Sequence, residues 1–136
     1  MVTIESLNSI GVGKLPGHLG IVITQVDKSE VIAELVITQS LLAPNGYLHA
    51  GTVVTIADTC AGYGCLATLP PGANGFTTIE LKSNHLGTAL EGTIVAVAKP
   101  AHLGRTTQIW DAVVTRKESG KTIALFRCTQ LILYAK

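Results

Sequence analysis

Apolar and β-branched residues gather in six short runs along the chain, and this pattern predicts six β-strands. A short polar connection joins the first two runs, as in a β-hairpin. The last four runs follow one another with short links, and short links join antiparallel neighbours. The six predicted strands lie at about residues 19–27, 31–38, 76–86, 91–103, 105–117 and 121–133.

Residues 51–69 break the alternation of a strand and predict a helix instead. The segment has no internal proline and ends at Pro70 and Pro71. It is apolar on every side, which is typical of a helix that is buried all round. A membrane span is the competing interpretation, but Asp58, the internal glycines and the strand-like neighbours argue against it.

One long helix among antiparallel strands can be buried only if the sheet curls around it. We therefore expect an α+β fold in which an antiparallel sheet wraps around one long central helix. The length of 136 residues corresponds to a single domain, residues 1–136. Residues 1–17 form a poorly patterned N-terminal lead-in with one helical turn before its glycines.

Composition narrows the classes of function. Hydrophobic residues make up 47% of the chain and charged residues 14%, so a disordered chain is excluded. A net charge of +1 and an aromatic content of 4% argue against binding of nucleic acid. A mean hydropathy of +0.43 favours further burial at a subunit interface.

The cysteines and the N-terminus indicate the compartment. Cys60, Cys65 and Cys128 contain no CxxC pair, so neither a disulfide framework nor a zinc ribbon is expected. The histidines and cysteines show no metal-ligand spacing, and we expect no metal or redox cofactor. Glu5 stands where a signal peptide would be basic. These features favour a reduced, cytoplasmic protein.

Asp58 is the first candidate for chemistry, because the predicted helix around it offers no Lys, Arg or His as a partner. An ionised carboxylate in apolar surroundings is destabilised unless it is paired or hydrated. Perturbed carboxylates cluster at functional sites, which favours a functional role. The alternative is a structural carboxylate that faces a hydrated interface or bonds a loop amide.

His49, Ala50 and Gly51 stand at the start of the same helix, where free backbone N–H groups carry a positive partial charge. Such a terminus can bind an anion or an oxyanion. Residues 50 and 58 lie about 12 Å apart along a helix that rises ~1.5 Å per residue. One substrate carbonyl cannot easily contact both, so a shared site would lie between two subunits.

The segment LHAGTVVTIADT at residues 48–59 resembles the signature of hotdog-fold acyl-CoA thioesterases. The similarity is to the branch named after the phenylacetic acid degradation thioesterase (PaaI-like). Residues 83–86 and 99–114 resemble two further recurrent segments of that branch, and the resemblance extends from about Leu19 to Leu133. It implies a hotdog fold and hydrolysis of an acyl- or aroyl-CoA thioester to the free acid and coenzyme A.

The resemblance also implies roles for individual residues. Asp58 corresponds to the catalytic carboxylate, acting as nucleophile or as general base on water. The Ala50 and Gly51 amides correspond to the oxyanion site, and His49 to a histidine near the sulfur. The family pocket lies at a dimer interface, and a dimer of dimers, a homotetramer, is expected. Further expected substrate contacts are Asn45, Gly46 and Thr59.

The chain departs from the family pattern at three positions. Ala50 stands where the family often has Gly, and Ala43 where the branch usually carries Asn or Gln. Gly62 stands where some members use Ser or Thr to hold the water. Ala43 and Gly62 favour one alternative, a non-catalytic acyl-CoA-binding domain, whereas Ala50 keeps the amide of the oxyanion site. A hotdog hydroxyacyl-thioester dehydratase is the other alternative.

Cations on predicted strand ends and turns are candidates for binding the phosphates of coenzyme A. The turn from His102 to Arg105 is favoured, because Gly104 would let backbone approach a ligand. A solvated strand end is the alternative for each of them. The cations considered are Lys82, His85, Lys99, His102 and Arg105.

Overall fold

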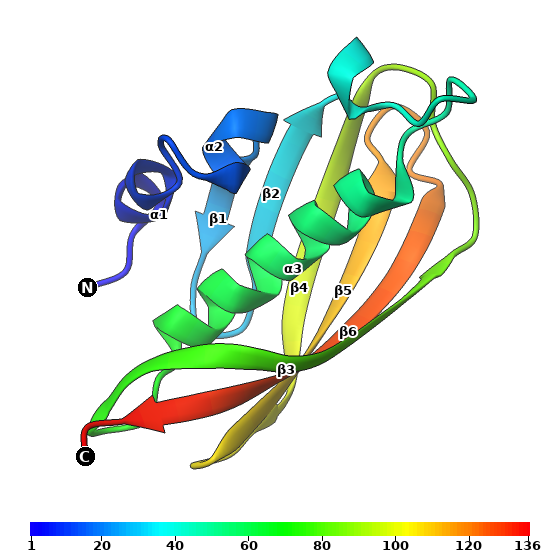
Figure 1. Ribbon diagram of the computed structural model, residues 1–136. Coiled ribbons are helices and arrows are strands. Elements are labelled where there is room, and N and C mark those ends of the chain that lie inside the picture. The colour runs from blue at the N-terminus through cyan, green and yellow to red at the C-terminus, as the bar shows by residue number, and fades with distance from the viewer.

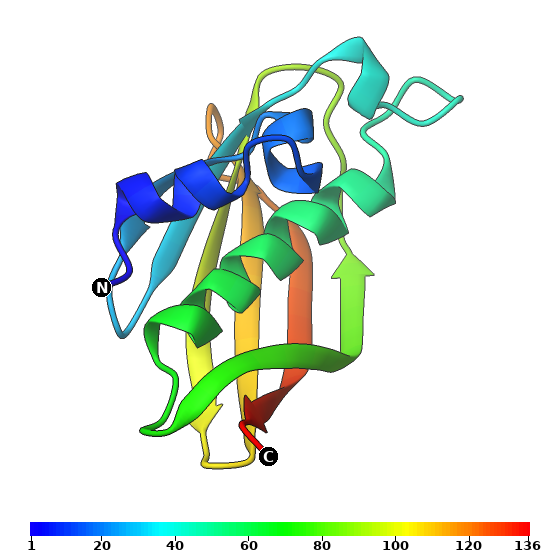
Figure 2. The same cartoon turned by 60° about the vertical axis from the view of Figure 1, so that its left-hand side comes forward.

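The computed structural model describes residues 1–136, and its six strands form one antiparallel sheet in the order β1-β2-β4-β5-β6-β3. The sheet curves around the long helix α3 (Figures 1 and 2). The strands are β1 (Val22–Val26), β2 (Val31–Val36), β3 (Ala73–His85), β4 (Thr93–Leu103), β5 (Thr107–Arg116) and β6 (Thr122–Tyr134). The helices are α1 (Ile4–Ile10), α2 (Leu15–Leu19), the 3-10 turn η1 (Gln39–Leu41) and α3 (Ala50–Ala67).

Helix α3 is buried against the inner face of the sheet, and its small residues set how closely it approaches. Trp110 on β5 is fully buried in the core. A Cβ atom at Gly64 would lie 2.4 Å from two atoms of the Trp110 ring, so only glycine allows this contact. The expected class, an α+β fold with an antiparallel sheet around one long helix, is confirmed.

The short link between the two strands predicted β3 beside β4, and the structure shows that this prediction was wrong. β3 pairs with β6 at the far edge of the sheet. The link at residues 86–92 crosses the end of the sheet instead of turning back as a hairpin. The Leu86 and Gly87 amides both donate to the Ile123 carbonyl, at 2.8 and 3.2 Å, and hold the link there.

The N-terminal lead-in is more ordered than one helical turn. Helix α1 begins with a capping box between Thr3 and Ser6. The Asn8 side chain accepts from the Ile23 amide at 2.8 Å and donates to the Ile23 carbonyl at 3.1 Å. It therefore bonds to the free edge of β1 and ties α1 to the sheet.

The expectation that α3 is buried on every side was also wrong for the single chain. The residues that face the sheet are buried, whereas Thr55, Asp58, Thr59 and Tyr63 are only partly buried. The sheet covers one side of the helix, and the short helix α2 contacts the other side only in part (Figure 2). No helix of the structure is both long and apolar enough to cross a membrane.

Candidate active site

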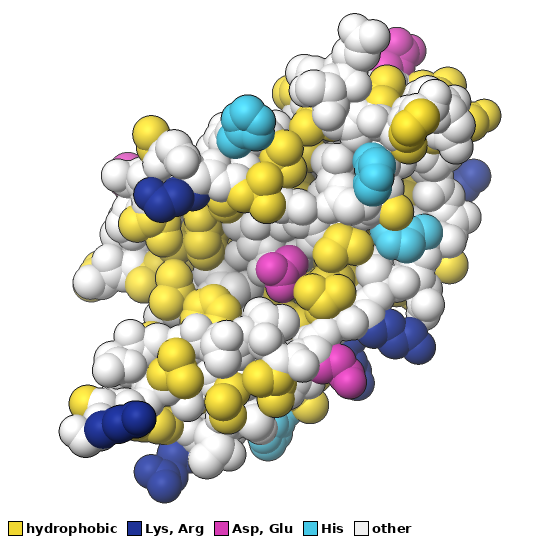
Figure 3. Space-filling model, viewed as in Figure 1, with side chains coloured by type: hydrophobic (Ala, Val, Ile, Leu, Met, Phe, Trp, Pro, Cys, Tyr) yellow, Lys and Arg dark blue, Asp and Glu magenta, His cyan; other side chains and the backbone are white.

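Asp58 lies halfway along α3 and lines a cavity of about 180 Å³. Three elements form the walls: α2 on one side, α3 as the floor and β3 on the other side. Figure 3 shows an acidic group at the centre of this face of the molecule, with hydrophobic side chains beside it. The lining residues are Pro16, Asp58, Thr59, Gly62, Tyr63, Leu66, Phe76 and Thr78.

The Asp58 carboxylate has no partner within the chain. Its Oδ1 atom is buried and makes no hydrogen bond. Burial therefore raises the pKa of Asp58 above its ordinary value of 3.8, since the charged form loses hydration and gains no bond in return. A carboxylate of raised pKa is a stronger base towards water than an exposed one.

Asp111 on β5 is a second carboxylate for comparison, and its pKa is shifted in the opposite direction. It receives two hydrogen bonds from Arg127, at 2.6 and 2.8 Å. These bonds lower the pKa of Asp111. Asp111 is thus satisfied as one half of an ion pair on the outer face of the sheet, whereas Asp58 is left available for chemistry.

The three cysteine thiols are unsuited to nucleophilic attack. Cys60, Cys65 and Cys128 are free and buried. Burial raises the pKa of each to about 12, and the nearby Asp58 charge adds to the rise at Cys128. A thiol with such a pKa stays protonated at neutral pH, so Asp58 is the stronger candidate for the reacting group.

His49 caps the N-terminus of α3. Its Nδ1 atom accepts from the Gly51 amide at 2.7 Å. A neutral imidazole that accepts at Nδ1 carries its proton on Nε2, where it can donate to a ligand. The Gly51 amide is thereby used within the chain, while the Ala50 amide has no acceptor in the chain. Of the two amides expected to form the oxyanion site, Ala50 is the one left free.

One chain does not bring the two halves of the expected site together. His49, Ala50 and Gly51 are absent from the lining of the Asp58 cavity. About 12 Å of helix separates Ala50 from Asp58, as the rise of ~1.5 Å per residue requires. Within a single chain, Asp58 and the N-terminus of α3 therefore cannot act on the same carbonyl.

The other expected substrate contacts divide between the cavity and the surface. Thr59 lines the Asp58 cavity. Asn45 and Gly46 lie exposed in the loop before α3, outside that cavity. The Asn45 Oδ1 atom accepts from the Tyr47 amide at 3.1 Å, so this side chain stabilises its own turn.

The expected phosphate-binding cations fall into two separate groups. Lys82 and His85 belong to β3, whereas His102 and Arg105 flank the turn between β4 and β5. Lys82 lies opposite Arg127 of β6 in the register of the β3–β6 ladder. Arg105 lies 5.8 Å from the ring centroid of Tyr134, which is seven residues further along β6 than Arg127. At ~3.3 Å per residue, about 23 Å separates the two groups.

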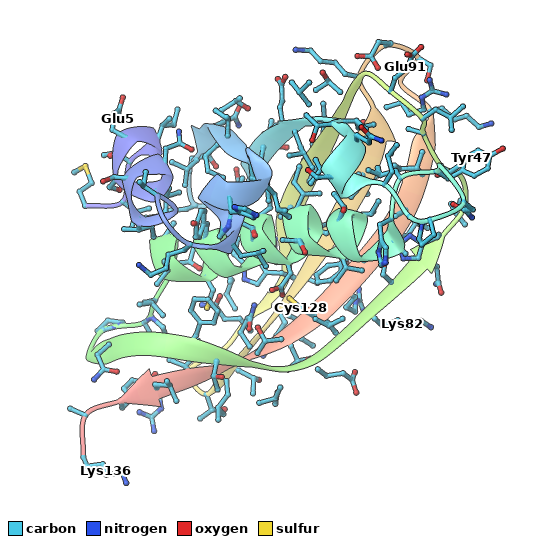
Figure 4. The ribbon with its side chains drawn as sticks, turned by 45° about the horizontal axis from the view of Figure 1, so that its top comes forward. Glu5, Tyr47, Lys82, Glu91, Cys128 and Lys136 are labelled. Atoms are coloured by element: carbon cyan, nitrogen blue, oxygen red, sulfur yellow. The ribbon has the colours of Figure 1, made fainter.

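Lys82 and Lys99 lie at the surface of the sheet, and Gly104 is required by the turn that it occupies. Lys82 borders a groove of about 400 Å³ on the outer face of the sheet and points away from α3 (Figure 4). Lys99 forms an ion pair with Glu30 at 3.6 Å. A Cβ atom at Gly104 would lie 2.6 Å from His102 Nε2 and 2.8 Å from the Thr107 carbonyl oxygen, so the turn itself requires this glycine.

Part of the cavity lining was not predicted from the sequence. Tyr63 and Leu66 follow Asp58 on the same helix face, and Phe76 and Thr78 come from β3. Thr78 donates to Gln130, a fully buried residue of β6. A signal for Gln130 was present, because it occupies an inward-facing position in the alternating pattern of β6.

One antiparallel sheet wrapped around one long helix is the hotdog fold, and the unpaired carboxylate halfway along that helix marks the candidate site. A family model described as the thioesterase superfamily matches residues 45–123. The chain belongs to this superfamily.

Individual relatives agree with this assignment. A 1,4-dihydroxy-2-naphthoyl-CoA hydrolase from Listeria monocytogenes is 33% identical over 82% of this chain and 89% of its own length. An Escherichia coli protein of the same name is 31% identical over 97% and 96%. A solved thioesterase from Haemophilus influenzae aligns with a TM-score of 0.91 at 27% identity, covering 98% of this chain and 92% of its own.

These findings confirm the hotdog fold and the activity of a thioester hydrolase that the resemblance implied. The dehydratase and the non-catalytic binding domain receive no support from these relatives.

Proposed function

We propose that the protein hydrolyses acyl-CoA thioesters, with Asp58 as the carboxylate that acts on the thioester, either as general base or as nucleophile. The buried, unpaired Oδ1 atom of Asp58 in its cavity carries the proposal. The names of two relatives, both hydrolases of an aromatic CoA thioester, support the choice of substrate. Release of free thiol from a panel of acyl-CoA and aroyl-CoA thioesters tests it.

A carboxylate and water suffice for this hydrolysis, so the proposal includes no metal or redox cofactor. The proposal also assigns the protein to the PaaI-like branch and to the reducing cytoplasm. The three free cysteines support the reducing compartment.

The proposal includes a homodimer in which the Ala50 amide and the His49 ring of one chain meet Asp58 of the other. Strand β3 is a 13-residue edge strand with one unpaired side. It carries the exposed residues Ile79 and Leu81, which are 57% and 44% accessible. A long edge strand with unpaired backbone groups can pair with another strand, and a second copy of β3 would complete it about a twofold axis. Two such dimers would form the tetramer.

We predict that sedimentation at micromolar concentration shows a dimer or a larger assembly. The active site as proposed needs two chains, so enzyme activity must follow the assembled species on dilution. A monomer with undiminished turnover would contradict the shared site.

The Asp58 cavity favours a compact, apolar acyl group. Tyr63, Leu66 and Phe76 supply its apolar walls. Its volume of about 180 Å³ is similar to that of an engineered apolar cavity of about 150 Å³ that binds benzene. We propose a single aromatic ring or a short acyl chain as the group that it holds.

Phe76 should limit the length of that group. Its Cζ atom lies 3.0 Å from where a Cβ atom at Gly62 would be, so its ring packs directly over the helix. Replacing Phe76 by Ala is expected to lengthen the cavity. The ratio of kcat/KM for a longer acyl chain to kcat/KM for a shorter one should then rise about tenfold, which is the scale of discrimination for one or two added methylenes. The acyl-CoA panel measures the shift. Replacing Phe126, which is buried elsewhere in the core, by Leu is the control and should leave the ratio unchanged.

A further inference from the structure

Thr78 and Gln130 form a polar pair at the wall of the Asp58 cavity. Thr78 lines the cavity, and its Oγ1 atom donates to Gln130 Oε1 at 2.7 Å. Gln130 has no accessible surface, so this acceptor is fixed within the sheet. A hydroxyl has one proton to donate and two lone pairs. With its proton committed to Gln130, the Thr78 oxygen can only accept from a molecule in the cavity.

Thr78 lines the same cavity as Asp58. Gln130 Nε2 donates to Cys128 Sγ at 3.4 Å. Burial, followed by the Asp58 charge, raises the pKa of that thiol. Cys128 lies on β6 beneath α3 (Figure 4). Strand β3 also has an irregularity directly after Thr78, where the pairing register with β6 shifts. Bulges of this kind redirect side chains and are frequent beside active sites.

The chain has no polar side chain at the two positions where the resemblance leads one to expect a residue that places the water. These positions hold Ala43 and Gly62. At Gly62 the space for a side chain is already taken by the Phe76 ring, 3.0 Å from the position of a Cβ atom. The hydroxyl of Thr78 is an acceptor in the same cavity as the unpaired Asp58 carboxylate.

We propose that Thr78, held by Gln130, is a positioning residue that orients the attacking water against Asp58; this inference rests on the proposed function. The water donates one proton to Thr78 Oγ1 and the other to the Asp58 carboxylate. Both of its protons are then directed away from the substrate, and a lone pair of its oxygen faces the thioester carbon.

In the hydrolytic step the water oxygen bonds to the carbonyl carbon, and Asp58 takes one water proton. The carbon–sulfur bond then breaks, and the sulfur leaves with the bonding electron pair. The proton held by Asp58 passes to the sulfur, so the products are the free acid and the free thiol. Thr78 is unchanged throughout, and its contribution is to the orientation of water.

Three variants at neighbouring positions test the proposal with the thioester that the wild-type enzyme hydrolyses best. Thr78→Val keeps the shape of the side chain and should lower kcat about 10- to 100-fold, with little change in KM, because only the water is misplaced. Thr78→Ser keeps the hydroxyl and should restore kcat to within about threefold of wild type. Thr77→Val, one residue earlier on the opposite face of β3, is the control and should retain kcat.

Thr78→Val leaves the buried Gln130 oxygen unpaired, which can impair folding. The double variant Thr78→Val with Gln130→Leu removes both members of the pair and should show the same loss of kcat in a folded protein. Wild-type kcat in either folded variant overturns the proposal, as does a Thr78→Ser enzyme as slow as Thr78→Val. Failure of the proposed function has a different signature, because the wild type would then release no thiol from any thioester of the panel.

Discussion

Replacing Asp58 by Asn is expected to lower kcat at least about 100-fold while the protein stays folded and assembled. The substitution keeps the size of the side chain and removes both the base and the nucleophile, and loss of a general base costs about 10²- to 10⁴-fold. Thiol release under single-turnover conditions measures the effect. The matched control is Asp111→Asn, since Asp111 is a carboxylate of the outer sheet face that pairs with Arg127. Turnover near the wild-type level in Asp58→Asn would refute the mechanism.

The same substitution should raise the thermal stability at neutral pH. The folded state holds the Asp58 proton more tightly than the unfolded chain does, because burial raises its pKa above 3.8. The free energy of unfolding therefore falls as the pH rises from 3.8 through the raised pKa, and it stays lowered above that range. Asn carries no charge and avoids this loss. We expect a higher Tm for Asp58→Asn at pH 7, with a difference that shrinks as the pH approaches 4.

Activity should change with pH in the opposite direction to stability, because it falls as the pH falls. The base form of Asp58 is lost as the pH falls through its raised pKa, so the acid limb of the kcat profile should lie above the ordinary value of 3.8. Stability and activity are thus opposed at one carboxylate. A folded protein gains nothing from an unpaired buried charge, which is why its retention points to function.

The sequence predicted those features that depend on local patterns. Residues 51–69 predicted α3 because the alternation fails there and prolines follow, and the helix was found at Ala50–Ala67. Asp58 was recognisable because a charge stands out in an apolar helix. The position of β3 was not predictable in this way. A link of the length of residues 86–92 suits either a hairpin or a crossing over the sheet, and the choice depends on which strand edges are free.

The polar part of the cavity was missed for a related reason. Thr78 and Gln130 look like ordinary strand residues in the sequence. The alternation of β6 marks Gln130 as inward-facing, whereas β3 shows no alternating burial and Thr78 is exposed in the single chain. On β6 the buried positions include Phe126, Cys128, Gln130 and Ile132, so Gln130 is the polar member of an apolar series. For the expected phosphate-binding cations, the location was the part that could not be predicted. Their type is visible in the sequence, but the end of the sheet at which each lies depends on the strand order.

The division of the site between two chains leads to the prediction with the clearest outcome. If Asp58 of one chain and the Ala50 amide of the other act on the same thioester, each dimer contains two hybrid sites. Asp58→Asn disables one half. Ala50→Pro disables the other, because it removes the amide that has no acceptor within its chain. Proline is favoured at the first helical position, and His49 already has the extended backbone, φ −65° and ψ 134°, that a residue before proline adopts.

Each variant alone should be nearly inactive, since both of its sites lack one part. In a mixed dimer one site collects both defects and the other collects neither. Unfolding and refolding the two proteins together should restore about a quarter of wild-type activity, since about half of the dimers are mixed and each has one intact site. Ala50→Gly keeps the amide, and we expect it to be active as the control. If mass spectrometry shows mixed dimers and the mixture is as inactive as its parents, then Asp58 and the Ala50 amide do not act on one thioester from opposite chains.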